Sequence, residues 1–136
     1  MDPNANLAEV QGQSGVVLRV TQVLRDSGGF VTVQAVIENK GDTAVNPSSW
    51  VGEERGVVEA SFNSVAGATL VDKAGKKRYY VLRDTDNRCL CTTKIRALQP
   101  GASTAVFMQF PAPPATTTEV DFSLPTFATA SLKISG

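Results

Sequence analysis

The feature that most constrains the fold of this chain is the alternation of apolar and polar residues over 29–42, GFVTVQAVIENKGD. Side chains of a strand point alternately to opposite faces, so every second residue shares a face. One face is entirely apolar, with Val31, Val33, Ala35 and Ile37. The other face carries Thr, Gln and Glu, interrupted by Val36, and an Asn-Lys-Gly-Asp turn ends the segment. The pattern predicts a half-buried strand, and therefore an all-β domain with one solvated face on each sheet.

Further strand candidates follow along the chain, separated by glycine and proline turns. They span residues 16–25, 30–39, 57–62, 69–71, 78–83, 104–110, 119–124 and 127–134. Alternation is weakest over 50–62, where we expect a loop with a short strand at 57–62, or a short helix in its place. Seven to nine short strands at intervals of about eight to twelve residues are typical of a β-sandwich or a barrel.

The length of the chain suits a single domain, which we place at residues 16–136. Residues 1–15, MDPNANLAEVQGQSG, are polar and lack the pattern of a signal peptide, so we expect a flexible tether there. No apolar run approaches the roughly 20 residues that span a bilayer, so we expect no transmembrane segment. Two origins fit this start: a cytosolic protein, or an exported one whose signal or lipid anchor has been removed.

Charge and composition argue against several functional classes. Lys plus Arg and Asp plus Glu are 13 each, so the net charge is zero, and no basic stripe of the kind that binds nucleic acid is visible. The densest basic run, Lys76, Lys77 and Arg78, is interpreted as a solvated turn. The chain has no histidine, which removes the usual general base and the commonest zinc ligand. We therefore expect no enzyme and no cofactor, with a small enzyme that works without histidine as the third-ranked function.

Three segments, taken together, resemble a known family. They are VTVQAVIENKGDTAV, ATLVDKAGKKRYYVLRD and ALQPGASTAVFMQFPAPP. In this order they are similar to bacterial immunoglobulin-like extracellular domains, called telokin-like or immunoprotective domains. Such domains occur in envelope proteins that also carry a peptidoglycan-binding domain like that of outer membrane protein A.

The resemblance implies an immunoglobulin-like β-sandwich of seven to nine mostly antiparallel strands. It also implies an extracytoplasmic location, in the cell envelope or secreted, and a non-catalytic binding or spacer role. The partner would be a protein or a cell-envelope polymer, and we expect a monomer. The main alternative is a protease inhibitor, because small immunoglobulin-like inhibitors share this architecture; an exposed, rigid loop would favour it.

The matched residues also have plausible physical roles. Gly41 and Gly75 would supply turn geometry, and Pro100 with Gly101 a tight reversal. Two further matched positions are expected to anchor the core, Leu98 and Phe107.

Cys89 and Cys91 form the pattern with most chemical potential. In a flat strand their side chains share a face, with Cα atoms about 6.6 Å apart, so a disulfide between them requires a local bend. A disulfide is the preferred interpretation in an exported fold, followed by free buried thiols and then a metal or redox site. Such a small loop would contribute only about 1.6 kcal/mol, so the bridge would make the neighbouring loop rigid without holding the fold together.

Asp84, Asp86 and Asn87 resemble the start of a calcium-binding loop. The match fails at two later positions, because Cys89 stands where the loop needs glycine and Ile95 where it needs glutamate. A polar hairpin turn is the preferred interpretation, with a low-affinity calcium site as the alternative.

Four residues are candidates for surface contacts: Trp50, Tyr79, Tyr80 and Arg83. Tryptophan and tyrosine are enriched in binding surfaces. A single tryptophan in a sandwich is nevertheless more often part of the core. The two tyrosines are adjacent in a strand, so they point to opposite faces, and at most one of them faces the core; its neighbour, with Arg83 nearby, is the expected contact residue.

Overall fold

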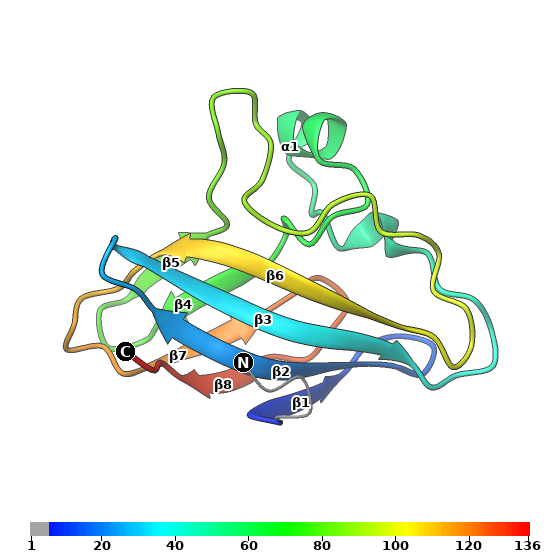
Figure 1. Ribbon diagram of the computed structural model, residues 1–136, viewed down its shortest axis with the longest axis horizontal. Coiled ribbons are helices and arrows are strands. Elements are labelled where there is room, and N and C mark those ends of the chain that lie inside the picture. Colours follow the sequence, from blue (N-terminus) through cyan, green and yellow to red (C-terminus); the bar gives the residue numbers. More distant parts are fainter. Residues whose placement is uncertain (1–5) are drawn as a thin grey trace.

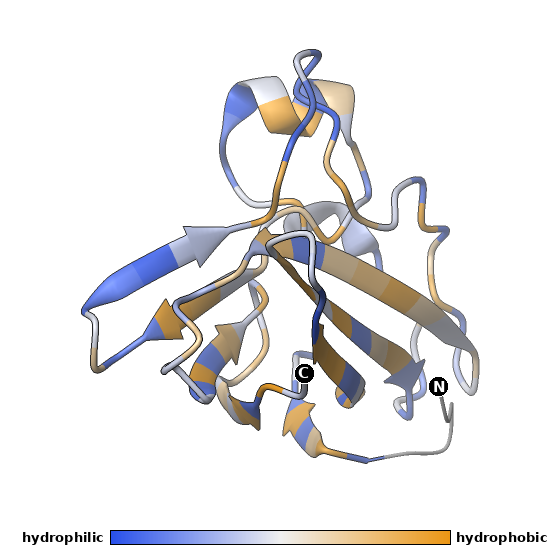
Figure 2. Ribbon diagram, turned by 60° about the vertical axis from the view of Figure 1, so that its left-hand side comes forward, coloured by the Kyte–Doolittle hydropathy of each residue, from blue (hydrophilic) through white to orange (hydrophobic). Residues whose placement is uncertain are grey.

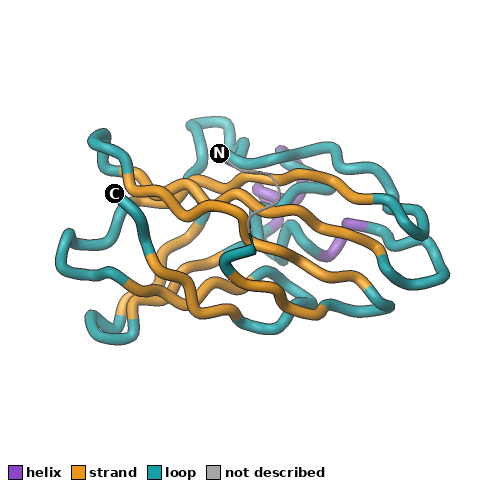
Figure 3. The backbone as a smooth tube through the Cα atoms, turned by 60° about the horizontal axis from the view of Figure 1, so that its bottom comes forward, coloured by secondary structure: helices purple, strands orange, loops and turns teal. Residues whose placement is uncertain are grey.

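The fold is a two-layered antiparallel β-sandwich, which confirms the expected fold class (Figures 1 and 3). The computed structural model describes residues 6–136. The first sheet has the order β1-β2-β3-β6, with β1 (Ala8–Gln11), β2 (Val16–Arg25), β3 (Phe30–Asn39) and β6 (Ser103–Pro111). The second has the order β5-β4-β7-β8, with β5 (Lys77–Tyr80), β4 (Thr69–Asp72), β7 (Glu119–Ser123) and β8 (Ala130–Lys133).

The order of the strands is immunoglobulin-like. In that fold strand B pairs with strand E in one sheet, and strand F lies between C and G in the other. Here β3 pairs with β6, and β7 lies between β4 and β8. Strands β3 and β6 therefore correspond to B and E, and strands β4, β7 and β8 correspond to C, F and G. The chain crosses between the sheets after β3, after β5 and after β6.

The predicted boundary at residue 16 is wrong, because strand β1 lies within the expected tether. β1 pairs antiparallel with β2, with Ala8 opposite Val20 and Gln11 opposite Val17. Ala8 and Val10 pack against the core, and this burial offsets the entropy lost when the segment is ordered. The first five residues of the predicted tether lie outside the described residues.

The core lies between the sheets, and the apolar face of β3 is fully buried as predicted. The alternation of apolar and polar residues along the strands is visible in Figure 2. The buried residues of β3 are Val31, Val33, Ala35 and Ile37. Leu98 is buried as expected, whereas Phe107 is 40% exposed and the expectation that it anchors the core is wrong. Met108 takes that role, because the register places it opposite Val33 and thus on the inner face.

Two short helices lie within residues 47–60. A 3-10 turn, η1 (Pro47–Ser49), is followed by the helix α1 (Arg55–Ala60). The predicted strand at 57–62 is therefore wrong, and the helical alternative holds. α1 buries Val57, and the helix lies outside both sheets (Figure 1). No helix among residues 6–136 is long and apolar enough to cross a membrane.

Of the three turn glycines, Gly101 has the expected positive φ, whereas Gly41 and Gly75 are required for a close contact. Gly101 has a φ of 80°, and Ala102 donates to the carbonyl of Gln99, so the predicted reversal at Pro100 and Gly101 is present. Gly41 does not have positive φ; a Cβ there would lie 2.2 Å from the Ser14 carbonyl oxygen. Gly75 likewise allows the approach of a neighbouring group, the carboxylate of Asp72. In that turn Lys76 adopts the left-handed conformation, with a φ of 54°.

Candidate functional site

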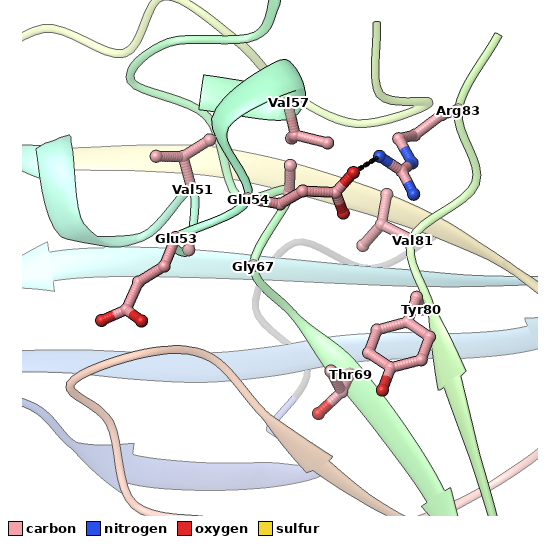
Figure 4. Close-up of a pocket in the computed structure, with 11 residues that line it drawn as sticks. Val51, Glu53, Glu54, Val57, Gly67, Thr69, Tyr80, Val81 and Arg83 are labelled. Atoms are coloured by element: carbon pink, nitrogen blue, oxygen red, sulfur yellow. Dashed lines mark hydrogen bonds and ion pairs between the residues drawn. The ribbon is translucent and has the colours of Figure 1, made fainter. Parts of the chain in front are cut away.

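The candidate site is a pocket of about 320 Å³ where β5 ends beside the loop that leads into α1 (Figure 4). Three chain segments meet there. The first, 51–57, leads into α1; the second, 66–69, leads into β4; the third, 80–83, leaves β5. The lining residues used below are Val51, Glu54, Val57, Tyr80, Val81 and Arg83.

The interior of the pocket is apolar because three valines point toward it. Val51, Val57 and Val81 are all buried in the described structure, and Figure 4 shows their side chains around the opening. Tyr80 extends the apolar surface outward, since its side chain is 63% exposed. Pockets that bind ligands combine an apolar lining with a few placed polar groups.

Two glycines allow the backbone to close around the pocket. The N–H of Gly67 donates to the carbonyl oxygen of Trp50 over 3.0 Å. A Cβ on Gly67 would lie 2.6 Å from that oxygen, closer than real Cβ contacts come. Gly52 has a φ of 86°, a conformation that favours glycine. The pocket wall therefore depends on both residues being glycine.

An ion pair crosses the upper rim of the pocket. The guanidinium of Arg83 contacts the carboxylate of Glu54, and the two side chains come from segments 29 residues apart (Figure 4). Both groups are partly exposed, so the pair contributes little to stability. It orients two charged side chains beside an apolar cavity, while Glu53 lies exposed at the opposite side of the mouth.

The structure divides the four predicted contact residues into two groups. Tyr80 and Arg83 line the pocket together. Trp50 is only 2% exposed and packs on Phe127, with ring centroids 5.9 Å apart, so the surface role considered for it is wrong. Tyr79 is 6% exposed because it stands opposite Leu70 on the inner face of the sheet. The structure thus agrees with the expectation that at most one of the two tyrosines faces the core: Tyr79 does, and Tyr80 is exposed.

Cys89 and Cys91 are joined by a disulfide at the base of a projecting loop. Their Sγ atoms lie 2.04 Å apart, and their Cα atoms are 5.2 Å apart, which reflects the local bend that bridging requires. The backbone of the flanking residues bonds to β6, since Leu82 donates to Gln109 and Gln109 donates to Leu90. The two arms of the loop are joined by hydrogen bonds, from Asp84 N–H to the Arg88 carbonyl and from Leu90 N–H to the Leu82 carbonyl, and the disulfide constrains the second arm alone.

The calcium candidate is a hydrogen-bonded turn within this loop. Oδ1 of Asp84 accepts the backbone N–H groups of Asp86, at 2.8 Å, and of Arg88, at 3.0 Å. The backbone N–H of Asn87 donates to the Asp84 carbonyl. Nowhere in residues 6–136 do three potential metal-ligating side chains gather, so the structure adds no ligand to this candidate.

The carboxyl groups with shifted pKa values lie outside the pocket, at the hairpin between β4 and β5. Hydrogen bonds from the Gly75 backbone and the Thr117 hydroxyl lower the pKa of Asp72 below its ordinary value. A hydrogen bond from Lys73, whose Nζ lies 3.0 Å away, likewise lowers the pKa of Asp121. Both groups favour the ionised form and are engaged in structure, which is unlike a poised general base.

Sequence reasoning missed the wall of the pocket formed by Val51, Glu54, Val57 and Gly67. The first three lie in the stretch with the weakest alternation, 50–62, where no period indicates which side chains converge, and Gly67 follows that stretch. Gly52, within this stretch, and Gly67, after it, are the signal that could have indicated a close backbone approach.

Comparisons with known proteins identify no family for this chain. No protein-family model matches the chain, and no curated protein matches it. Among solved structures, the chain is similar to an uncharacterized β-sandwich protein from Clostridium difficile 630. The two share 9% sequence identity with a TM-score of 0.48, over 95% of this chain and 92% of the other. The fold assignment follows from the sheet topology.

Proposed function

We propose that this protein is a non-catalytic binding module of a bacterial cell-envelope or secreted protein, and that it holds a side chain of a protein partner in the pocket beside Tyr80. One observation carries the proposal: Tyr80 is 63% exposed at the mouth of an apolar pocket lined by Val51, Val57 and Val81. A large aromatic ring at the rim of a preformed apolar cavity is typical of an anchor point for recognition.

The polar groups of the pocket suit orientation better than reaction. They belong to Glu53, Glu54, Tyr80, Arg83 and Thr69, and Glu54 and Arg83 already neutralise each other. A partner side chain entering the pocket would bury the valines and meet this ion pair at its polar end. This arrangement supports binding with defined geometry.

The proposed location outside the cytoplasm has support from the disulfide and from the family resemblance. Disulfides persist in oxidising compartments. Natively expressed protein should therefore incorporate no alkyl group when treated unreduced with iodoacetamide, as measured by intact mass. Two added groups would show free thiols and would argue against this location.

The binding role can be tested with an uncharged peptide. The probe is a fluorescein-labelled octapeptide that alternates Val and Thr, titrated with protein in a fluorescence anisotropy assay. We expect measurable binding that Tyr80→Ala weakens about tenfold, because the largest exposed contact at the pocket is lost. Phe107→Ala is the matched control, since Phe107 is an exposed aromatic on the other sheet, and it should leave the affinity unchanged.

A parallel sedimentation assay with purified peptidoglycan sacculi distinguishes the protein partner from an envelope polymer. Sacculi that pellet the protein, together with a peptide that fails to bind, would overturn the choice of a protein partner. Peptide binding that is insensitive to Tyr80→Ala would overturn the choice of this pocket.

A protease inhibitor remains the second candidate function, favoured by the projecting loop. The loop rises beside α1 in Figure 1, and the disulfide and the Asp84 turn brace it. A preorganised loop can enter a protease cleft with little loss of conformational entropy. The exposed Arg88 makes trypsin the appropriate test enzyme. Inhibition that is lost in Arg88→Ala, with the loop uncleaved, would support this function; cleavage after Arg88 or no inhibition would exclude trypsin-like targets.

A further inference from the structure

We propose that β5 is a docking edge for an extended, acidic segment of a partner protein, which adds antiparallel to β5 as a fifth strand of the second sheet. The inference rests on the proposed binding function, because the same partner segment would continue into the pocket beside Tyr80. It names the chemistry of the partner: apolar residues in its N-terminal half and carboxylates in its C-terminal half.

The first argument is that the outer edge of β5 is free over Lys77–Tyr80; beyond it the N–H of Leu82 donates to Gln109 of β6. Within residues 6–136, the backbone of Lys77–Tyr80 makes no hydrogen bond other than those to β4. An unpaired strand edge presents N–H and C=O groups at the spacing of another strand. Lys77, Arg78 and Tyr80 are all exposed, so side chains do not cover this edge. In Figure 2, β5 is the hydrophilic strand at the left margin of the molecule.

The edge strands of the first sheet, β1 and β6, are partly covered by other segments. On β6, Gln109 exchanges hydrogen bonds with Leu82 and Leu90, and Phe107 accepts one from Thr92. On β1, the carbonyl of Gln11 accepts the N–H of Ala128 over 3.0 Å. Each edge strand of the first sheet therefore has part of its outer edge bonded to another segment, whereas no such bond is made by Lys77–Tyr80 of β5 in the described residues.

The second argument is charge. Lys76, Lys77 and Arg78 are consecutive, exposed cations that form no ion pair within the described residues. The neighbouring Lys73 is already paired with Asp121, and Asp72, which stands opposite Lys77, offsets one of the three charges. The hairpin end of β5 thus carries a net positive charge on a chain whose net charge is zero. Electrostatic complementarity calls for carboxylates opposite this end.

The third argument fixes the direction of the partner. Every strand pair of the second sheet is antiparallel, so an added strand would run opposite to β5. Its C-terminal half would then lie beside Lys77, and its N-terminal half beside Tyr80 and the pocket. Glu53, exposed at the mouth of the pocket, would repel carboxylates at that end. A peptide that begins apolar and ends acidic is complementary to the pocket at the Tyr80 end of β5 and to the cations at the Lys77 end.

The experiment compares three labelled octapeptides by fluorescence anisotropy with the full chain. The first is the neutral Val/Thr peptide described above. The second keeps its first four residues and replaces the threonines and valines of its second half with Asp and Glu. The third is the acidic peptide with alternate backbone nitrogens methylated, which removes donors from its edge. We expect the acidic peptide to bind about tenfold more tightly than the neutral one at low salt, and methylation to abolish most of the binding.

Charge-reversal variants test whether Lys77 and Arg78 cause the preference for the acidic peptide. The double variant Lys77→Glu/Arg78→Glu should remove the preference for the acidic peptide. Arg96→Glu/Lys133→Glu is the matched control with the same change in net charge; it alters two exposed cations away from β5, and it should retain the preference. Circular dichroism melting of both variants checks that the fold is intact.

The outcomes separate the two proposals. If the neutral and acidic peptides bind equally and Tyr80→Ala weakens both, the proposal of an acidic partner at β5 is overturned and the proposal of the pocket is supported. Acidic binding that survives backbone methylation would show a patch for any polyanion, and would also overturn strand addition. Acidic binding that depends on Lys77 and Arg78 but not on Tyr80 would support the edge and overturn the pocket. Failure of both peptides would overturn both proposals.

Discussion

The side-chain amide of Asn39 donates a hydrogen bond to the carbonyl oxygen of Leu98 over 2.9 Å, although the two residues are 59 positions apart. The same nitrogen donates to Thr43 at 2.8 Å, and the amide oxygen accepts the N–H of Gly41 at 2.9 Å. Asn39 is fully buried at the end of β3. One side chain therefore fixes the turn after β3 and joins it to the loop before β6.

Asn39→Ala should destabilise the protein by about 2–3 kcal/mol, because buried carbonyl and N–H groups would lose their partner. Urea unfolding followed by circular dichroism would measure the change. Asn46→Ala is the control: Asn46 caps η1 at an exposed position, and its loss should cost about 1 kcal/mol or less. Equal effects for the two variants would contradict the role given to Asn39.

Trp50→Ala should lower the free energy of unfolding by about 3–5 kcal/mol, since it leaves a cavity against Phe127 and the core. Trp50→Phe should cost less. The exposed Phe62→Ala should stay within about 0.5 kcal/mol of the native protein. Trp50 is the only tryptophan, so the native fluorescence should shift to longer wavelength on unfolding. Native emission already typical of solvent-exposed tryptophan would show that Trp50 is not buried.

Asp72 should make stability depend on pH in the acid range. Its pKa is lowered in the folded state, first by the Gly75 backbone hydrogen bond and then by Thr117. The stabilisation is therefore fully present above the unfolded pKa of about 4, and is lost as the pH falls through the lower folded pKa. Asp72→Asn should destabilise at pH 7, with the difference from the native protein shrinking below about pH 4.

Thermal melts across this pH range would test the role of Asp72. Asp42→Asn, at an exposed position of another turn, serves as the control and should follow the native curve. A constant difference between the native protein and Asp72→Asn at all pH values would rule out the linkage.

Removal of the disulfide in Cys89→Ala/Cys91→Ala should cost at most about 2 kcal/mol, because the closed loop is so short. The main effect should be local. Hydrogen exchange at residues 83–91 should accelerate, while the amides of β3 remain protected. Unfolding of the whole domain on reduction would show that the bridge holds the fold together.

Gly67→Ala should destabilise by about 1–3 kcal/mol, since the new Cβ would approach the Trp50 carbonyl and the Gly52 nitrogen to less than normal contact. Gly28→Ala is the matched control: the nearest atom to its added Cβ is a carboxylate oxygen of Asp26, 3.3 Å away. Denaturant unfolding of both variants would measure the difference, and a larger effect at Gly28 would contradict the tight closure at Gly67.

Much of the fold could be predicted from local pattern. The alternation over Phe30–Asn39 identified both the strand and its buried face, and the turn at Gln99–Ala102 follows from proline and glycine. Prediction failed where local signals are weak or shared. Val106, Phe107 and Met108 are all apolar, so their sequence does not reveal which of them faces inward. The pairing of Met108 with Val33 decides it.

The candidate site was predicted only in part, for the same reason. The sequence by itself determined that Tyr79 and Tyr80 point to opposite faces, because adjacent residues of a strand must. Only the tertiary structure decided that Tyr80 is the exposed one and that Arg83 meets Glu54 from a distant segment. Periodicity is a property of neighbouring residues, whereas a pocket is formed by segments whose approach depends on the packing of the whole core.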